Sequence, residues 1–307
     1  MLDRRIKLRH IEAFAAIAHH GQLKAACDAL NLSQPALSKT LKELEDVLGA
    51  RLMERGRAGT ALTPEGEVFL EFATQGLAAL RRGVDGVSAI RAGAGDRLKV
   101  GTLPSVAARL MPRAVALFLR MAPDTRLVLR DGAHGALTAD LRSGALDMVI
   151  GRMGTPEMMQ GLSFTQLYQE RVVCCCDPTH PLLQGAPPAP EALAGWPILY
   201  PPEGAAIRPL LDRWRLALGV PDFPRSIACV SGAFGRNFVP GSDALWFISE
   251  GVVARDVTEG RLALLPLDLS LTSGPVGLMT RPETAPSRAQ TLFARSLAQA
   301  IDTMPTS

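Results

Sequence analysis

The first ninety residues carry hydrophobic positions at helical spacing. The clearest apolar stripe lies between Ser33 and Gly49, and its members are Leu37, Leu41, Leu44 and Leu48. This stripe predicts a helix with one buried face, beginning after Ser33 and ending at Gly49. The same spacing over residues 9–20 and 22–30 predicts two shorter helices, each followed by a residue that favours a left-handed stop.

A hairpin and a long helix are expected next. The segments "ARLMERG" and "GTALTP" predict two short strands around Gly56–Gly59. Thr63 and Pro64 then open a helix that runs to about Arg91. Its apolar and small residues are spaced nearly as in a heptad seam: Phe69, Phe72, Gly76, Leu80, Gly83, Val87 and Ile90. The seam favours pairing with a second copy of the chain, and the alternative is a helix packed on its own chain.

Short apolar runs alternate with helical patterns from residue 97 onward. This alternation is typical of βαβ units with a mainly parallel sheet. Two α/β lobes joined by crossing segments would place a ligand cleft at their junction. We therefore expect three parts: a helical domain with a hairpin over 1–63, a long linker helix over 64–94 and a two-lobed α/β domain over 95–307.

The third helix presents polar residues opposite its apolar stripe, and two short helices before it complete a helix-turn-helix arrangement. Gln, Ser and Lys side chains contact base edges and phosphates. The candidate DNA contacts are Ser33, Gln34, Pro35, Ser38, Lys39, Lys42 and, from the hairpin, Arg55. The alternative is a solvated helix that happens to carry lysines. The formal net charge of +3 does not decide between them.

Several protein classes are disfavoured. No apolar run of about 18 residues predicts a membrane span, and no secretory signal precedes the first helix, so we expect a cytoplasmic protein. Cys174, Cys175 and Cys176 are adjacent and cannot converge on one metal from a strand. We interpret them as small apolar residues of a buried strand, with a redox sensor as the alternative. The sequence has no P-loop, GxSxG or HExxH motif, which disfavours an enzyme, and no cofactor is expected.

Candidate ligand residues stand near strand ends in the second half. Ser105 follows a predicted strand and opens a helix, and Arg208 lies in the first turn of another. A serine hydroxyl with arginine would favour a carboxylate. Trp246 and Phe247 end a further strand and would supply an apolar wall. The alternatives are a helix cap, a surface charge and buried core side chains.

The segment from "RHIEAFAAIAHHG" through "LSQPALSKTLKELEDVLGARLMER" to "LTPEG" resembles the amino-terminal domain of LysR-type transcriptional regulators. "LRSGALDMVIGR" and "DPTHPL" stand where that family has comparable elements. The resemblance implies an all-α winged helix-turn-helix domain, a dimerising linker helix and a two-lobed α/β domain like the periplasmic binding proteins. It also implies homo-oligomers, dimers or tetramers, that bind double-stranded promoter DNA at interrupted inverted repeats and contact RNA polymerase. By position, the resemblance adds His134 and Arg152 to Ser105 as effector contacts in the cleft.

A finer resemblance is to the LysR subgroup that controls protocatechuate and related aromatic-acid catabolism. It rests on segments such as "FGRNFVPGSDALWFISEGVVARD", and it implies a small carboxylated effector. The sequence departs from the family at Leu23-Lys24, where small hydroxyl residues are usual, and at Lys39, where arginine is common. Two alternatives stay open: a sugar-responsive LysR regulator, and a solute-binding protein or enzyme whose helical segment only mediates oligomerisation.

Overall fold

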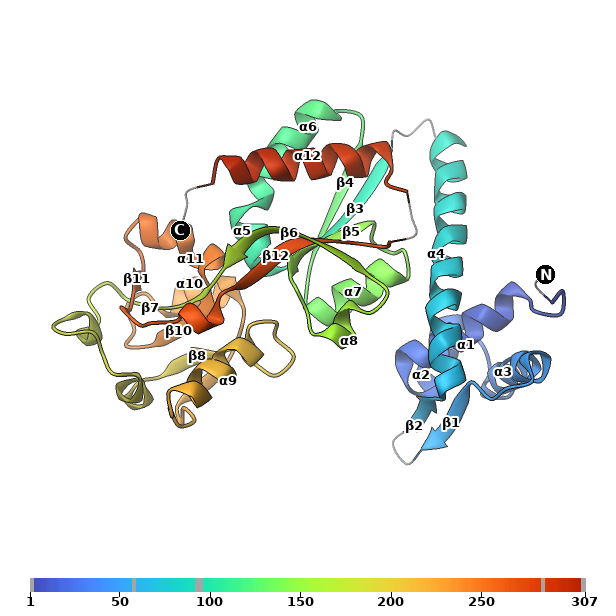
Figure 1. The fold of residues 1–307 in the computed structure, drawn as a ribbon, viewed down its shortest axis with the longest axis horizontal. Coiled ribbons are helices and arrows are strands. Elements are labelled where there is room, and N and C mark those ends of the chain that lie inside the picture. The colour runs from blue at the N-terminus through green and yellow to red at the C-terminus, as the bar shows by residue number, and fades with distance from the viewer. Residues whose placement is uncertain (1–2, 57–58, 92–95, 283–284, 305–307) are drawn as a thin grey trace. The chain divides into compact units, whose positions relative to one another are not determined.

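The computed structural model describes residues 3–56, 59–91, 96–282 and 285–304 of the 307-residue chain (Figure 1). The chain forms two compact units, residues 1–93 with 142–145, and residues 94–141 with 146–307. Among the described helices, none is long and apolar enough to cross a membrane.

The first unit contains the predicted helices and hairpin. Its elements are α1 (Leu8–His20), α2 (Leu23–Leu30), α3 (Gln34–Leu48), β1 (Met53–Gly56), β2 (Gly59–Leu62) and α4 (Pro64–Arg91). The three predicted stops are confirmed, because Gly21, Asn31 and Gly49 have φ of 66°, 53° and 68°. Ser33 caps α3 by accepting a hydrogen bond from the Ala36 amide at 3.4 Å.

The core of this unit joins all four helices. Phe14 of α1 is fully buried and its ring centroid lies 5.5 Å from that of Phe69 on α4. From α3, Leu37 and Leu44 are fully buried, and Leu41 and Leu48 pack against the same cluster. The apolar stripe of α3 therefore faces inward, and its polar face is left outside.

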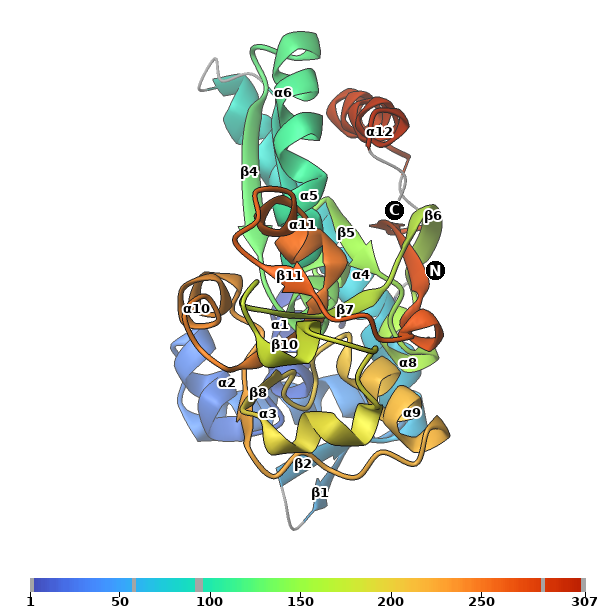
Figure 2. The same cartoon turned by 90° about the vertical axis from the view of Figure 1, so that its left-hand side faces the viewer.

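The second unit has two lobes, each built on a five-stranded sheet (Figures 1 and 2). The sheet of the first lobe has the order β4-β3-β5-β12-β6. Its strands are β3 (Arg97–Thr102), β4 (Arg126–Asp131), β5 (Met148–Arg152), β6 (Ser163–Glu170) and β12 (Gly274–Thr280). Its helices are α5 (Pro104–Arg109), α6 (Met111–Met121), α7 (His134–Arg142), α8 (Pro156–Met159) and α12 (Arg288–Asp302). Helices α6 and α12 meet through Phe118 and Phe293, whose ring centroids are 5.2 Å apart.

The sheet of the second lobe has the order β11-β7-β10-β8-β9. Its strands are β7 (Val172–Cys176), β8 (Ile198–Tyr200), β9 (Ser226–Ala228), β10 (Leu245–Ser249) and β11 (Ala263–Leu264). Its α-helices are α9 (Arg208–Ala217), α10 (Gly232–Phe238) and α11 (Glu250–Thr258), and η1 (Pro181–Leu183), η2 (Pro190–Gly195) and η3 (Ser270–Thr272) are short 3₁₀ turns.

The sheets are mixed rather than mainly parallel, which corrects the sequence-based expectation. In the first lobe, β3 pairs parallel with β4 and β5, whereas β12 pairs antiparallel with β5 and β6. In the second lobe, β7 is antiparallel to β10 and β11. The chain crosses between lobes twice, after β6 and before β12. The first strand after each crossing, β7 or β12, is the one that runs antiparallel to its neighbours.

The two crossing segments are tied together. The Thr272 hydroxyl accepts a hydrogen bond from the Val172 amide at 3.0 Å, and Thr272 is fully buried. Thr272 lies at the end of η3, just before β12, and Val172 begins β7. This hydrogen bond holds the outgoing and returning chain side by side at the junction of the lobes.

The three adjacent cysteines occupy β7, and all are buried, as the sequence pattern predicted. Burial raises the pKa of all three thiols, and that of Cys176 reaches about 12. A buried thiol with a raised pKa holds almost no thiolate at neutral pH, so it reacts slowly with oxidants and disulfides. This placement favours a packing role over a redox sensor.

We expect a single fast thiol in the native protein. Cys229 is half-buried, whereas Cys27 and the three cysteines of β7 are buried. Titration with a thiol-reactive chromogenic disulfide at pH 8 should therefore give one rapid equivalent, and all five cysteines after denaturation. Cys229→Ser should remove the rapid phase. Two or more rapid equivalents in that variant would contradict the buried placement of β7.

Candidate DNA-binding and effector sites

The exposed face of α3 carries the predicted DNA contacts. Ser33, Gln34, Pro35, Lys39 and Lys42 are exposed, and Ser38 is half-buried beside them. Helical residues separated by three or four positions share a face, so these side chains form one polar surface opposite the leucine stripe. We call this set of six residues the α3 face.

Hydrogen bonds from α1 and from the start of β1 fix the orientation of α3. The Glu43 carboxylate accepts hydrogen bonds from Arg9 at 3.0 Å and from His10 at 3.2 Å, both on α1. These hydrogen bonds, Arg9 first, lower the pKa of Glu43. Glu45 accepts from the amides of Leu52 and Met53 at 2.8 and 3.2 Å, which joins α3 to the start of β1. Sequence inspection missed these acids, because a charge on a polar helix face gives no sign of its partner.

The hairpin is held to the helices at both ends. Thr60 on β2 donates through its hydroxyl to the Gly21 carbonyl at 3.1 Å. Thr63 caps α4 by accepting from the Gly66 amide at 3.0 Å. A side chain at Gly66 would stand 2.0 Å from the Leu52 carbonyl oxygen, so only glycine allows α4 to approach the hairpin this closely. Arg55 belongs to β1, but its side chain is outside the described part of the structure.

A buried ion pair lies where the chain leaves the first lobe. Arg152 ends β5 and Glu170 ends β6, and their closest charged atoms, Nη2 and Oε2, are 3.8 Å apart. The side chains are only 4% and 0% exposed. Among the described residues, the three guanidinium nitrogens of Arg152 and Oε2 of Glu170 have no hydrogen-bond partner. A buried charge without hydrogen bonds is costly, so this pair is poised to accept a better partner.

Glu170 also contacts both lobes. Its Oε1 accepts from the Gly251 amide in the first turn of α11, at 3.2 Å, and it accepts from the Ser105 hydroxyl of α5. Burial raises the pKa of Glu170, and the favourable charge of Arg152 and these hydrogen bonds offset part of that rise. Burial likewise lowers the pKa of Arg152 and raises that of the neighbouring Tyr168. Sequence inspection did not select Glu170, since a single acid at a strand end is a common pattern.

The His134 ring contacts the backbone of Arg152. Its ring is buried, and Nε2 lies 3.1 Å from the Arg152 carbonyl oxygen. A proton on Nε2 makes this approach a hydrogen bond. A side chain at Gly154 would stand 2.5 Å from the imidazole, so glycine is required for the ring to lie there. Ser105 and Arg152 thus meet at Glu170, and His134 lies beside the Arg152 backbone.

The remaining candidates lie within the second lobe. Arg208 donates through Nε to both Asp212 oxygens at 2.9 and 2.8 Å, and its guanidinium lies 5.0 Å from the Tyr200 ring centroid. Trp246 and Phe247 are fully buried in the core of this lobe. Their placement agrees with the core alternative, since neither presents surface to a ligand here. Among the described residues, no cluster of His, Cys, Asp and Glu is arranged to hold a metal ion.

Profiles of two protein families match the chain. Residues 8–67 match the profile described as "Bacterial regulatory helix-turn-helix protein, lysR family", and residues 91–302 match "LysR substrate binding domain". Together they span the α3 face and both lobes. The chain belongs to the LysR family of transcriptional regulators. It is therefore a DNA-binding regulator with an effector-binding domain.

Full-length relatives share this organisation. The chain is 43% identical to the HTH-type transcriptional regulator PcaQ of Agrobacterium fabrum over 300 residues, covering 98% of this chain and 96% of PcaQ. It is 34% identical to the uncharacterized HTH-type transcriptional regulator YdcI of Escherichia coli, covering 98% of both. Full-length BenM matches the fold with a TM-score of 0.56 at 24% identity, covering 98% of this chain and 100% of BenM.

Removing a lysine from the α3 face should weaken DNA binding without unfolding the chain. Lys39 and Lys42 are exposed and lie outside the leucine core. If each lysine neutralises one phosphate, its removal should reduce the slope of log affinity against log salt by about 1. Lys39→Ala and Lys42→Ala should show this reduction by fluorescence anisotropy with promoter DNA. The exposed Arg126→Ala, in the other unit, serves as control; lysine variants indistinguishable from it would refute the assignment of the α3 face.

Proposed function

We propose that this regulator responds to a small carboxylate, an aromatic acid of the protocatechuate type or its ring-opened product. The observation that carries this proposal is the buried guanidinium of Arg152, which lacks hydrogen-bond partners among the described residues. Arginine binds carboxylates through two parallel hydrogen bonds, whereas its only described counter-ion here is 3.8 Å away. The pathway assignment rests on the sequence resemblance to the subgroup that controls aromatic-acid catabolism.

Effector binding would act through Glu170. A ligand carboxylate that pairs with Arg152 displaces the Glu170 carboxylate, which also bonds Gly251 of the opposite lobe. Glu170 begins the crossing segment that continues through Arg171 to Val172. A change in these interactions changes the relative stability of the possible arrangements of the two lobes. A ligand shifts the equilibrium between these arrangements if it binds one of them more tightly than the other. The paired DNA-binding domains would then sit differently on the promoter.

Dimerisation would use α4. Its side chains Val68, Phe72, Leu80, Val84 and Val87 are between 56% and 66% exposed. Such an apolar stripe on a long helix favours a partner helix. A dimer presents two α3 faces at a fixed spacing, as an inverted-repeat operator requires. We further propose a cytoplasmic location and contact with RNA polymerase at the promoter.

The proposal predicts a thermal shift with aromatic carboxylates. A ligand that binds only the native protein stabilises it by about 2.7 kcal/mol at 100 times its Kd. Protocatechuate, related acids, muconates, ring-cleavage lactones and sugars should be compared by thermal melting. Arg152→Gln combined with Glu170→Gln removes both buried charges together, which avoids an unpaired one, and should abolish the shift. Arg225→Gln, an exposed control, should retain it. A rise with sugars alone would discard the carboxylate proposal.

Carboxylate affinity should also depend on pH through Glu170. Its pKa is raised, so at lower pH Glu170 is neutral and no longer competes for Arg152. As pH rises through that pKa, Glu170 becomes charged, holds Arg152 and repels the ligand, so affinity falls. Glu170→Gln should bind the carboxylate more tightly than the unmodified protein at neutral pH and lose this pH dependence in calorimetric titrations. An unchanged pH profile in Glu170→Gln would remove Glu170 from the effector site.

A further inference from the structure

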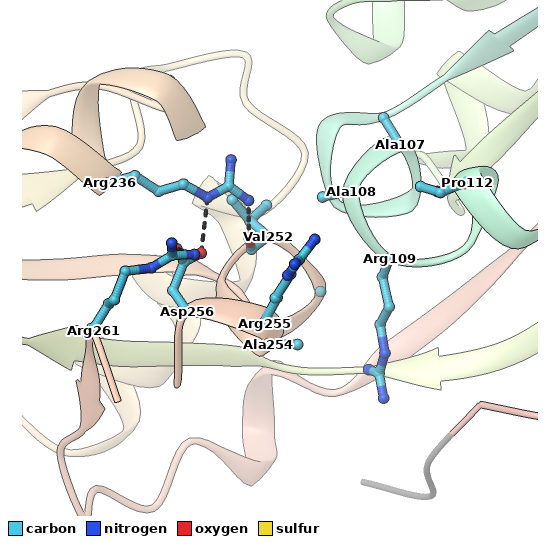
Figure 3. A pocket seen from close by; sticks show the side chains of 11 residues that line it. Ala107, Ala108, Arg109, Pro112, Arg236, Val252, Ala254, Arg255, Asp256 and Arg261 are labelled. Atoms are coloured by element: carbon cyan, nitrogen blue, oxygen red, sulfur yellow. Dashed lines mark hydrogen bonds and ion pairs between the residues drawn. The ribbon is translucent and has the colours of Figure 1, made fainter. Parts of the chain in front are cut away.

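A cavity lies between the lobes, next to the enclosed Arg152–Glu170 pair, since Gly251, which lines it, donates to Glu170. It has a volume of about 690 Å³ and lies between α5 and the start of α6 on one side and α10 and α11 on the other (Figure 3). Four arginines line it: Arg109 from the first lobe, and Arg236, Arg255 and Arg261 from the second. We call it the arginine groove. Its size is within the range of small-molecule sites, roughly 300 to 1,000 Å³.

The acids in the groove do not neutralise these arginines. Asp256 is buried and accepts hydrogen bonds from Arg236 at 2.8 Å and from Arg261 at 2.7 Å. Glu259 pairs with Arg255 at 2.6 Å and with Arg261 at 2.9 Å. Four arginines against two acids leave two positive charges in excess. The neighbouring acid Glu170 pairs with Arg152 and also interacts with Arg109, and Glu250 pairs with Arg171. With these residues included, six cations face four acids, so an excess of two positive charges remains.

The ion pairs also pre-orient the guanidinium groups. Arg236 is fixed by Asp256 and by the Val252 carbonyl, and Figure 3 shows Arg236 and Arg261 converging on Asp256. Arg109 lies on the opposite wall in the same view. A ligand that meets oriented donors loses less conformational entropy on binding than one that must order them. Donors on two walls suit a ligand with more than one anionic group.

The floor of the groove is the contact between the lobes. A side chain at Gly251 would stand 3.0 Å from the Ser105 carbonyl oxygen and 3.3 Å from the Arg109 Cβ. The first turn of α11 therefore touches α5 directly. A ligand that bridges Arg109 and Arg255 would span this contact from outside and hold the two helices together.

We propose that the arginine groove binds a small polyvalent anion, a di- or tricarboxylate or a phosphate, at a site that adjoins the Arg152–Glu170 pair but does not include Arg152. By linking α5 to α11, the bound anion stabilises the closed contact of the two lobes. The groove is partly open, but its volume and its position between two lobes fit a small anion better than the phosphate backbone of DNA, which needs a long exposed surface.

Calorimetric titration of the full-length protein tests the groove. Citrate and inorganic phosphate serve as probes, with sodium chloride holding ionic strength constant, and they separate carboxylate from phosphate chemistry. Arg255→Gln removes a side chain that is 84% exposed and paired with Glu259, so the fold should persist. We expect citrate or phosphate to bind this variant at least about tenfold more weakly, as removal of a charge-assisted bidentate interaction implies.

Arg225→Gln is the matched control, because Arg225 is exposed in the same lobe and does not line the groove. Arg109→Gln tests the opposite wall and should weaken binding of the same anion. Equal anion affinity in Arg255→Gln and Arg225→Gln would overturn the proposal, and so would an Arg255→Gln variant that loses DNA affinity but keeps the anion. The thermal-shift test of the proposed function uses variants of Arg152 and Glu170 and not of Arg255. A negative result for the groove can therefore be told apart from a negative result for the proposed function.

Discussion

A buried carboxylate at the junction of the two lobes links the main features of the effector domain. Glu170 is fully enclosed, and it reaches Arg152 on β5, Ser105 on α5 and the Gly251 amide on α11. Removing a charge from water costs several kcal/mol before compensation, so Glu170 must keep these partners or take up a proton. The need to compensate the Glu170 charge therefore connects the two lobes, the crossing segment and the candidate ligand residue Arg152.

This constraint also sets the surroundings of Arg152. Arg152 is held by its own strand and by His134 at its carbonyl, and its guanidinium is left with a distant counter-ion. In the proposed function, a carboxylate that pairs with Arg152 changes the interactions of Glu170 and, through them, the contact between the lobes. The tie between Thr272 and Val172 lies on the same crossing strand, two residues after Glu170.

The DNA-binding unit depends on a different kind of interaction. Apolar packing around Phe14, Leu37 and Leu44 fixes α3, and the hydrogen bonds of Glu43 and Glu45 set its orientation. Because the apolar core and these hydrogen bonds position α3, the side chains on its exposed face are not needed to hold the fold. Gln34, Lys39 and Lys42 are therefore available to DNA without cost to the fold.

The sequence by itself determined the local elements of both units. Helix periodicity, the capping of α3 by Ser33, the left-handed stops at Gly21, Asn31 and Gly49, and the burial of the β7 cysteines all depend on neighbouring residues. The mixed direction of the sheets, the core position of Trp246 and Phe247, and the meeting of Arg152 with Glu170 were decided only by the tertiary structure. The reason is physical: spacing along the chain sets local backbone geometry, whereas ion pairs and strand partners join residues that are distant in sequence.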